Sequence, residues 1–69
     1  MRPVEQLYKI FCARMAQLLE GEANAYARHP ALQDADQQII RSLRENCRQW
    51  KHQIEKLDRA YSSRRLDPS

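Results

Sequence analysis

The sequence predicts an all-α protein, an antiparallel two-helix hairpin that dimerises into a four-helix bundle. Its 69 residues include only one Gly and three Pro, and 30% of them are charged, which is typical of a helical chain rather than of a β-sandwich or barrel. The second half carries a heptad pattern, in which apolar or aromatic residues recur at alternating steps of three and four. The pattern consists of Ile40, Leu43, Cys47, Trp50, Ile54, Leu57 and Tyr61. So narrow a stripe favours packing of one helix along another.

The first helix is expected over residues 3–28. Pro3 suits the first turn, where its missing N–H is not needed, and Glu5 places a negative charge at the positive end of the helix. Pro30 ends the helix, because proline disfavours the α conformation at the residue before it. The apolar side comprises Val4, Leu7, Tyr8, Phe11, Cys12, Met15, Leu18, Leu19, Ala25 and Tyr26. One antiparallel neighbour is too narrow to cover this side. The flank expected to stay uncovered consists of Cys12, Leu19 and Tyr26.

A turn over residues 29–34 and a second helix over residues 35–62 are expected next. Asp34 and Gln37 have the spacing of a capping box, in which Asp34 accepts a hydrogen bond from the amide three residues later and Gln37 reaches back. Pro30 is also compatible with a short extra turn before this helix, and the sequence leaves that choice open. Residues 63–69 show no apolar periodicity and are expected to form a frayed tail.

Folding the two helices back about a turn near Ala31 brings apolar residues level with one another. The expected pairs are Leu18 with Leu43, Met15 with Cys47, Phe11 with Trp50, Tyr8 with Ile54, and Val4 with Leu57. The residues expected in the core or at the dimer seam are Phe11, Met15, Leu18, Leu19, Leu43, Cys47, Trp50, Ile54 and Leu57. A core of this size supplies only about 3–5 kcal/mol, so we expect a homodimer to provide the remaining stability.

No catalytic, cofactor or metal site is expected. Cys12 and Cys47 lie far apart, with no C-x-x-C spacing and no neighbouring histidine, which is typical of small core residues. His29 precedes a proline and His52 lies on the polar side of the second helix, so neither is placed to activate a nucleophile. Charged residues interrupt the most apolar stretch, and no signal-peptide pattern precedes it. We therefore expect a cytoplasmic protein that does not span a membrane and is not an enzyme.

The expected hairpin tip combines acidic and apolar residues at the start of the second helix. Asp34 and Asp36 precede Ile39 and Ile40, and few neighbours are available there to cover an isoleucine. Carboxylates steer a cationic partner while an apolar side chain supplies affinity, so these four residues are the candidate protein-binding site. The alternative is a plain helix start, in which the acids favour the first turn and Leu32 or the second copy covers Ile39.

A basic ridge is expected beside the heptad pattern. It consists of Arg41, Arg44, Arg48 and Lys51. With a net charge of +3, the chain permits a nucleic-acid partner. In size and general plan it resembles the plasmid copy-control protein ROP, a helical-hairpin dimer that grips paired RNA loops. The alternative is a solvated flank of the bundle, where Glu45 and Glu55 offset part of the positive charge.

A chain of 69 residues that folds as a helical hairpin and dimerises also resembles the quorum-sensing anti-activator proteins of temperate bacteriophages. The likeness is one of size and plan along the whole chain, and no motif carries a functional residue over. The resemblance implies a host protein as partner: the DNA-binding domain of a LuxR-type transcription regulator, with a pilus-assembly ATPase as a second candidate. It implies no cofactor.

Overall fold

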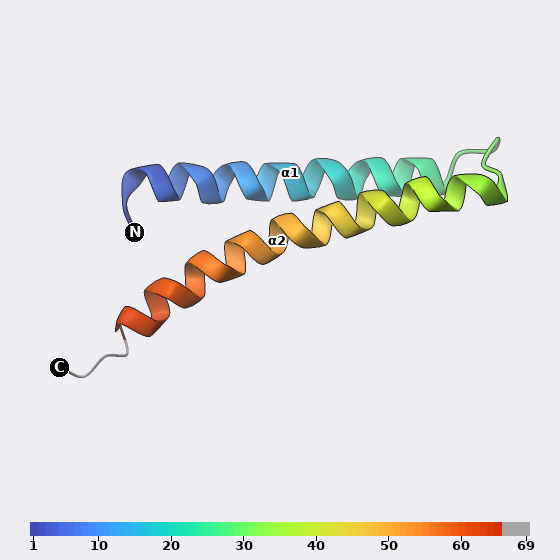
Figure 1. Cartoon of the computed structure of the whole chain (residues 1–69). Helices are drawn as coiled ribbons and strands as arrows, with labels where there is room; N and C mark the ends of the chain where they lie inside the picture. Colours follow the sequence, from blue (N-terminus) through green and yellow to red (C-terminus); the bar gives the residue numbers. More distant parts are fainter. Residues whose placement is uncertain (66–69) are drawn as a thin grey trace.

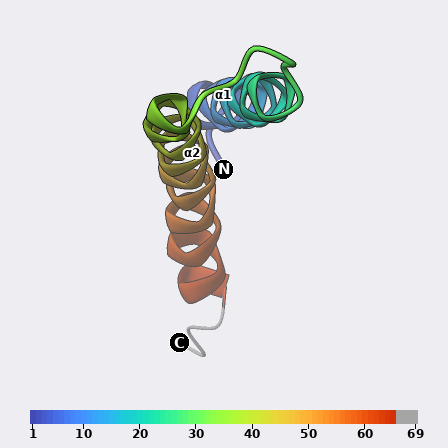
Figure 2. The ribbon, with the colours of Figure 1, turned by 90° about the vertical axis from the view of Figure 1, so that its right-hand side faces the viewer.

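Two long helices joined by a short loop form an antiparallel hairpin (Figure 1). The computed structural model describes the backbone of residues 1–65 and the side chains of residues 1–62. Helix α1 spans Pro3–Ala27, a 3₁₀ turn η1 spans Asp34–Asp36, and helix α2 spans Gln37–Arg65. The predicted all-α hairpin is therefore confirmed. The helix ends remote from the loop lie at the same end of the molecule, and the two helices diverge toward that end (Figures 1 and 2).

Proline begins α1 and proline shapes the loop that follows it. Pro3 is the first residue of α1, and the chain before it is extended. After α1 ends, the N–H of Leu32 donates to the carbonyl of His29 at 3.1 Å, which closes a turn with Pro30 at its second position. The N–H of Ala31 donates to Nδ1 of His29 at 3.0 Å. No residue of the described chain has a positive φ angle, so this loop forms without needing glycine.

The start and the end of α2 differ from the predicted positions. The N–H of Gln33 donates to Oδ2 of Asp36 at 3.0 Å, and the N–H of Asp36 donates to the carbonyl of Gln33 at 2.9 Å. The capping interaction thus lies one residue earlier than the predicted one between Asp34 and Gln37, because a tighter 3₁₀ turn precedes the α-helix. Helix α2 continues to Arg65, three residues beyond the predicted end. Residues 66–69 of the predicted tail lie outside the described residues.

The core of the hairpin is made mostly of small side chains. The buried residues of the described part are Cys12, Ala16, Ala23, Ile40 and Cys47. Small residues at a helix contact allow the two axes to approach closely, and the thiol of Cys47 donates to the carbonyl of Ala16 at 3.2 Å. The side of α1 that meets α2 is an inner seam with alternating steps of four and three. We define the inner seam as Glu5, Lys9, Cys12, Ala16, Leu19 and Ala23.

The rotation of α1 about its axis therefore differs from the prediction. Phe11 and Trp50 do meet, with ring centroids 5.3 Å apart in an edge-to-face arrangement, so this predicted pair is confirmed. Val4 and Leu18 are 71% and 57% exposed, so the predicted layers of Val4 with Leu57 and of Leu18 with Leu43 do not bury these two residues within the single hairpin. Cys12, predicted on the uncovered flank, is 0% exposed. Helix α2 packs on the small residues of α1, which turns the large apolar residues outward.

Gly21 provides a test of the helical assignment in α1. A Cβ atom added at this position meets no atom within 4 Å. Gly21→Ala is therefore expected to raise the free energy of unfolding by about 0.5–1 kcal/mol, because alanine restricts the unfolded chain without creating a clash. Ala13→Gly, at an exposed position of the same helix, is the reciprocal control. It is expected to lower the free energy of unfolding by a similar amount. Urea denaturation followed by circular dichroism measures both, and destabilisation by Gly21→Ala would contradict the open environment.

Candidate interaction surfaces

An outer stripe of large apolar residues runs along α1 beside the inner seam. We define it as Val4, Leu7, Phe11, Met15 and Leu18. At 100° per residue, these five side chains fall within about a quarter of the helix circumference. Four of them are exposed, and Met15 is half-buried. Contiguous apolar surface of this kind on a small protein usually marks an interface.

The opposite edge of the contact between α1 and α2 is polar. Nζ of Lys9 lies 2.7 Å from Oδ1 of Asp58, and Nζ of Lys51 lies 3.8 Å from Oε2 of Glu20. Both ion pairs link the two helices across solvent-exposed positions, where such pairs contribute little to stability. They do, however, mark this edge as a surface in contact with water. The hairpin thus has one polar edge and one apolar edge. Water solvates the polar edge favourably, whereas exposure of the apolar edge to water is unfavourable.

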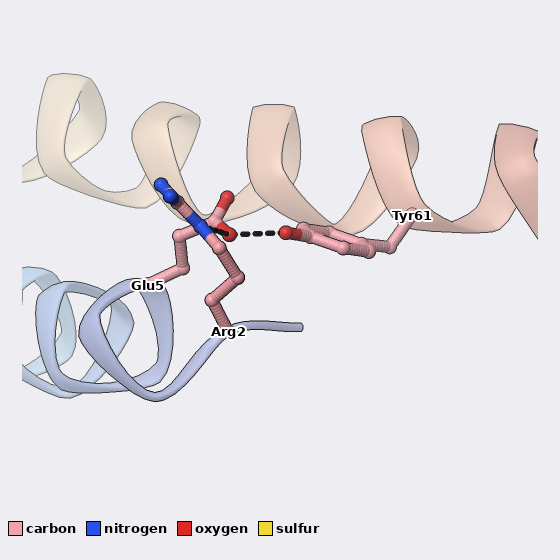
Figure 3. A network of polar contacts seen from close by, with 3 residues as sticks. All are labelled: Arg2, Glu5 and Tyr61. Carbon is pink, nitrogen blue, oxygen red and sulfur yellow. Dashed lines mark hydrogen bonds and ion pairs between the residues drawn. The ribbon is translucent and has the colours of Figure 1, made fainter.

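A polar clasp of Arg2, Glu5 and Tyr61 closes the end of the hairpin where the helices diverge (Figure 3). The hydroxyl of Tyr61 on α2 donates to Oε1 of Glu5, and Nε of Arg2 donates to the same oxygen at 2.8 Å. These two interactions, the Tyr61 hydrogen bond first, lower the pKa of Glu5 to about 2. Glu5 also raises the pKa of Arg2, chiefly by its hydrogen bond. The long side chains of the clasp connect α1 and α2 at the end where the helices diverge, because small apolar side chains do not reach across the wider separation there.

A tip pocket of about 230 Å³ lies at the loop end of the hairpin. It is lined by Tyr26, His29, Ala31, Leu32, Asp36 and Ile39. Its walls are mostly apolar, and Asp36 and His29 are the two residues with ionisable groups near neutral pH among those that line it. Because Nδ1 of His29 accepts the hydrogen bond from Ala31, its Nε2 is the ring nitrogen left to face a ligand. The pocket has the size and polarity to receive one apolar side chain of a partner.

The four residues predicted at the protein-binding tip are separated by the structure. Ile39 is 49% exposed and lines the tip pocket together with Asp36. Asp34 is exposed on η1. Ile40 is only 3% exposed and belongs to the hairpin core, because consecutive helical residues point about 100° apart. A contact surface at the tip therefore includes Asp34, Asp36 and Ile39 and excludes Ile40.

The predicted basic ridge is also divided. Arg44, Arg48 and Lys51 line an open groove of about 280 Å³ together with Glu20 and Asn24 of α1, whereas Arg41 lies on a separate hollow of α2. Lys51 is near Glu20, and the guanidinium of Arg48 lies 3.3 Å from the carboxylate of Glu45. Acidic neighbours thus offset part of the positive charge, as expected for a solvated flank.

Comparison with known proteins gives no further guide to the function. No protein-family model matches it, and no match was found among curated proteins or solved structures. Among the residues that the structure describes, no three or more His, Cys, Asp or Glu side chains are grouped so as to hold a metal ion. Over the same residues, neither helix is long and apolar enough to cross a membrane. The exposed surfaces of the hairpin are therefore the basis of the proposed function.

Two features of these surfaces were missed by the sequence analysis. Tyr26, His29 and Leu32 line the tip pocket, although only the residues after them had been assigned to the tip. Their positions on both sides of Pro30 were the available signal, since a tight turn brings them together. The division of α1 into an inner seam and an outer stripe was the second feature. The inner seam and the outer stripe each have residues spaced alternately three and four apart, and two such series along one helix indicate contacts on two of its sides.

The polar clasp predicts a specific dependence of stability on pH. The pKa of Glu5 is lowered from 4.5 to about 2 on folding, so folding favours its ionised form. The contribution of Glu5 is fully present above pH 4.5 and is lost as the pH falls toward 2. Wild type is expected to be more stable than Glu5→Gln at neutral pH, and the two are expected to converge near pH 2. Urea denaturation at fixed protein concentration across this range measures the difference.

Tyr61→Phe is the control for this assignment. It removes the hydroxyl that makes the largest contribution to the lowered pKa of Glu5 and leaves the carboxylate in place. NMR titration of this variant is expected to give a Glu5 pKa closer to its ordinary value. An unchanged pKa would show that the clasp is absent in solution.

Proposed function

We propose that this protein is a small inhibitor or adaptor that works as a homodimer in the cytoplasm of a host cell and occludes a surface of a partner protein. The observation that carries the proposal is the tip pocket, which exposed Ile39 lines together with the acidic residue Asp36 of η1. An apolar anchor surrounded by groups of one charge is typical of protein interfaces, because the anchor supplies affinity and the charges supply orientation. We infer no catalytic activity and no cofactor.

Dimerisation into a helical bundle is the first part of the proposal. The chain exposes 5775 Å², whereas a folded monomer of 8.2 kDa exposes about 4,500 Å² by the usual scaling with mass. The excess is roughly 1,200 Å², and a stable interface buries about 800 Å² on each partner. The outer stripe supplies apolar area at the centre of such an interface. A second hairpin seated there completes four helices around a shared core.

A cationic protein surface is the kind of partner that suits the tip. Asp36 lines the apolar pocket and Asp34 is exposed on the same 3₁₀ turn, so the tip carries negative charge. DNA-contacting surfaces of regulators are rich in Lys and Arg. The resemblance to phage anti-activators in size and plan names one such partner, the DNA-binding domain of a LuxR-type quorum-sensing regulator. A pilus-assembly ATPase is the second candidate from the same resemblance. The proposal for either one rests on the tip chemistry and on this resemblance.

A nucleic-acid-binding hairpin of the ROP type is the second candidate function. It is favoured by the groove that Arg44, Arg48 and Lys51 line on one side of the hairpin. The acidic residues paired with two of these side chains weaken the positive field that phosphate binding requires. We therefore place the protein partner first.

Self-association is tested by sedimentation equilibrium at low micromolar concentration. Wild type is expected to have the mass of a dimer. Leu18→Asp is expected to produce a monomer, because it places a charge within the apolar interface. Ile10→Asp is the matched control, since Ile10 is also a half-exposed apolar residue of α1 but lies outside the outer stripe. A folded wild-type monomer would contradict the proposed dimer.

Partner binding is tested with purified DNA-binding domain of a LuxR-type regulator and isothermal titration calorimetry. Ile39→Asp is expected to weaken binding by about 2 kcal/mol or more, roughly 30-fold, because it replaces the apolar anchor. Helical content and dimer mass should remain unchanged, since Ile39 is exposed and an acid is favourable in the first turns of a helix.

Replacing Arg41, Arg44 and Arg48 by Gln separates the two candidate functions. This variant is expected to bind the protein domain nearly as wild type does. If it instead eliminates salt-dependent binding to double-stranded RNA or DNA while Ile39→Asp has no effect on any partner, the nucleic-acid function replaces the protein-binding one.

A further inference from the structure

We infer that the second copy packs antiparallel against the outer stripe, with the two-fold axis of the dimer near Phe11, so that the two hairpin tips point in opposite directions. This inference rests on the proposed homodimer and specifies its geometry. It concerns the surface made by α1, and it requires no change in the fold of either hairpin.

The outer stripe is symmetric about its midpoint. Val4 and Leu18 lie seven residues before and after Phe11, and Leu7 and Met15 lie four residues before and after it. In a dimer with two-fold symmetry, the same patch of each copy contacts the other. When the two stripes run antiparallel and their midpoints coincide, Val4 of one copy is level with Leu18 of the other, and Leu7 is level with Met15. Every large apolar residue of the stripe then meets another.

An aromatic cluster lies at this midpoint. The ring of Phe11 contacts Trp50 edge-to-face at 5.3 Å and stacks near Tyr8 at 6.4 Å between centroids. Phe11 is nevertheless 47% exposed, so one side of the cluster is open within a single hairpin. An axis near Phe11 joins the open sides of two such clusters. Aromatic residues at the centre of an interface commonly contribute most of its binding energy.

Charge distinguishes the antiparallel arrangement from a parallel one. Arg14 is exposed and flanks the stripe, and Glu22 lies on the same side of α1 beyond Leu18. A parallel dimer places Glu22 level with Glu22 of the second copy, so that two like charges meet along the line of the apolar contact. In the antiparallel dimer Glu22 falls outside the overlap of the two stripes, and Arg14 stays at the edge of the contact in either arrangement. The antiparallel arrangement thus avoids this repulsion.

This geometry determines how many partners one dimer binds. The rise of about 1.5 Å per helical residue places Ala27, at the end of α1, roughly 24 Å from Phe11, so the two tips lie about 50 Å or more apart. Two tip pockets that face away from each other engage two separate partner molecules. A parallel dimer presents both tips to one partner instead.

Cysteine cross-linking tests the arrangement in the full-length chain. Val4→Cys and Leu18→Cys are purified separately, mixed to allow exchange of subunits, and treated with a bis-maleimide that spans the usual 8–10 Å between packed helices. Covalent dimer is expected from the mixture and is expected to be absent from either variant alone. In the antiparallel dimer, the two copies of one introduced cysteine lie roughly 21 Å apart along the helix axis. Wild type is the control for reaction at the buried Cys12 and Cys47.

Peptide mapping of the covalent dimer and sedimentation of the uncoupled mixture distinguish the possible outcomes. A link between position 4 and position 18 supports the inference. Links between identical positions, formed by each variant alone, would overturn it and show a parallel dimer while leaving the proposed dimer intact. A mixture that sediments as monomer and does not cross-link would overturn both. Loss of partner binding in Ile39→Asp without any effect on cross-linking would show that the tip and the dimer surface are independent.

Discussion

The close approach of two helices over small side chains is the contact on which the rest of this structure depends. Cys12, Ala16 and Ala23 leave room for α2, and the thiol of Cys47 reaches the backbone of α1. Large side chains at these positions would hold the axes apart and weaken the contact. Because the small residues occupy one side of α1, the large apolar residues are displaced to the adjacent side. The core contact and the exposed outer stripe thus have a single cause.

This arrangement leaves the single hairpin with a small core. Among residues 1–62, whose side chains the structure describes, four of the five buried residues are Ala or Cys, whose burial removes little apolar area from water. The fifth, Ile40, adds a larger side chain. The end remote from the loop depends instead on polar contacts, with Glu5 bound by Tyr61 and Arg2. A chain with so little buried apolar area gains from covering what remains exposed. The surfaces described above therefore bear on stability as well as on binding.

Much of the fold could be predicted from the sequence, because Pro30 marks the loop and the heptad pattern of α2 is unambiguous. The rotation of α1 could not be predicted, since hydrophobic periodicity alone does not distinguish the inner seam from the outer stripe. Side-chain volume decided which of them faces α2, and the polar residues Glu5 and Lys9 obscured the start of the inner seam.

At the candidate site, the exposure of Ile39 agrees with the sequence analysis. The burial of Ile40 does not, although the helical period separates these neighbours and the heptad pattern already assigned Ile40 to the core. The wall of the tip pocket contributed by α1 could not be assigned without knowing the path of the loop.

The position of both helix ends on one side of the molecule has a mechanical consequence. A force that pulls the two ends apart separates α2 from α1 beginning at the clasp (Figures 1 and 3). Contacts then break one after another toward the loop, and no step requires all of them to slide at once. Local opening from this end involves few buried residues, because the core lies nearer the loop. Such a hairpin peels apart under a smaller load than one whose ends lie at opposite poles.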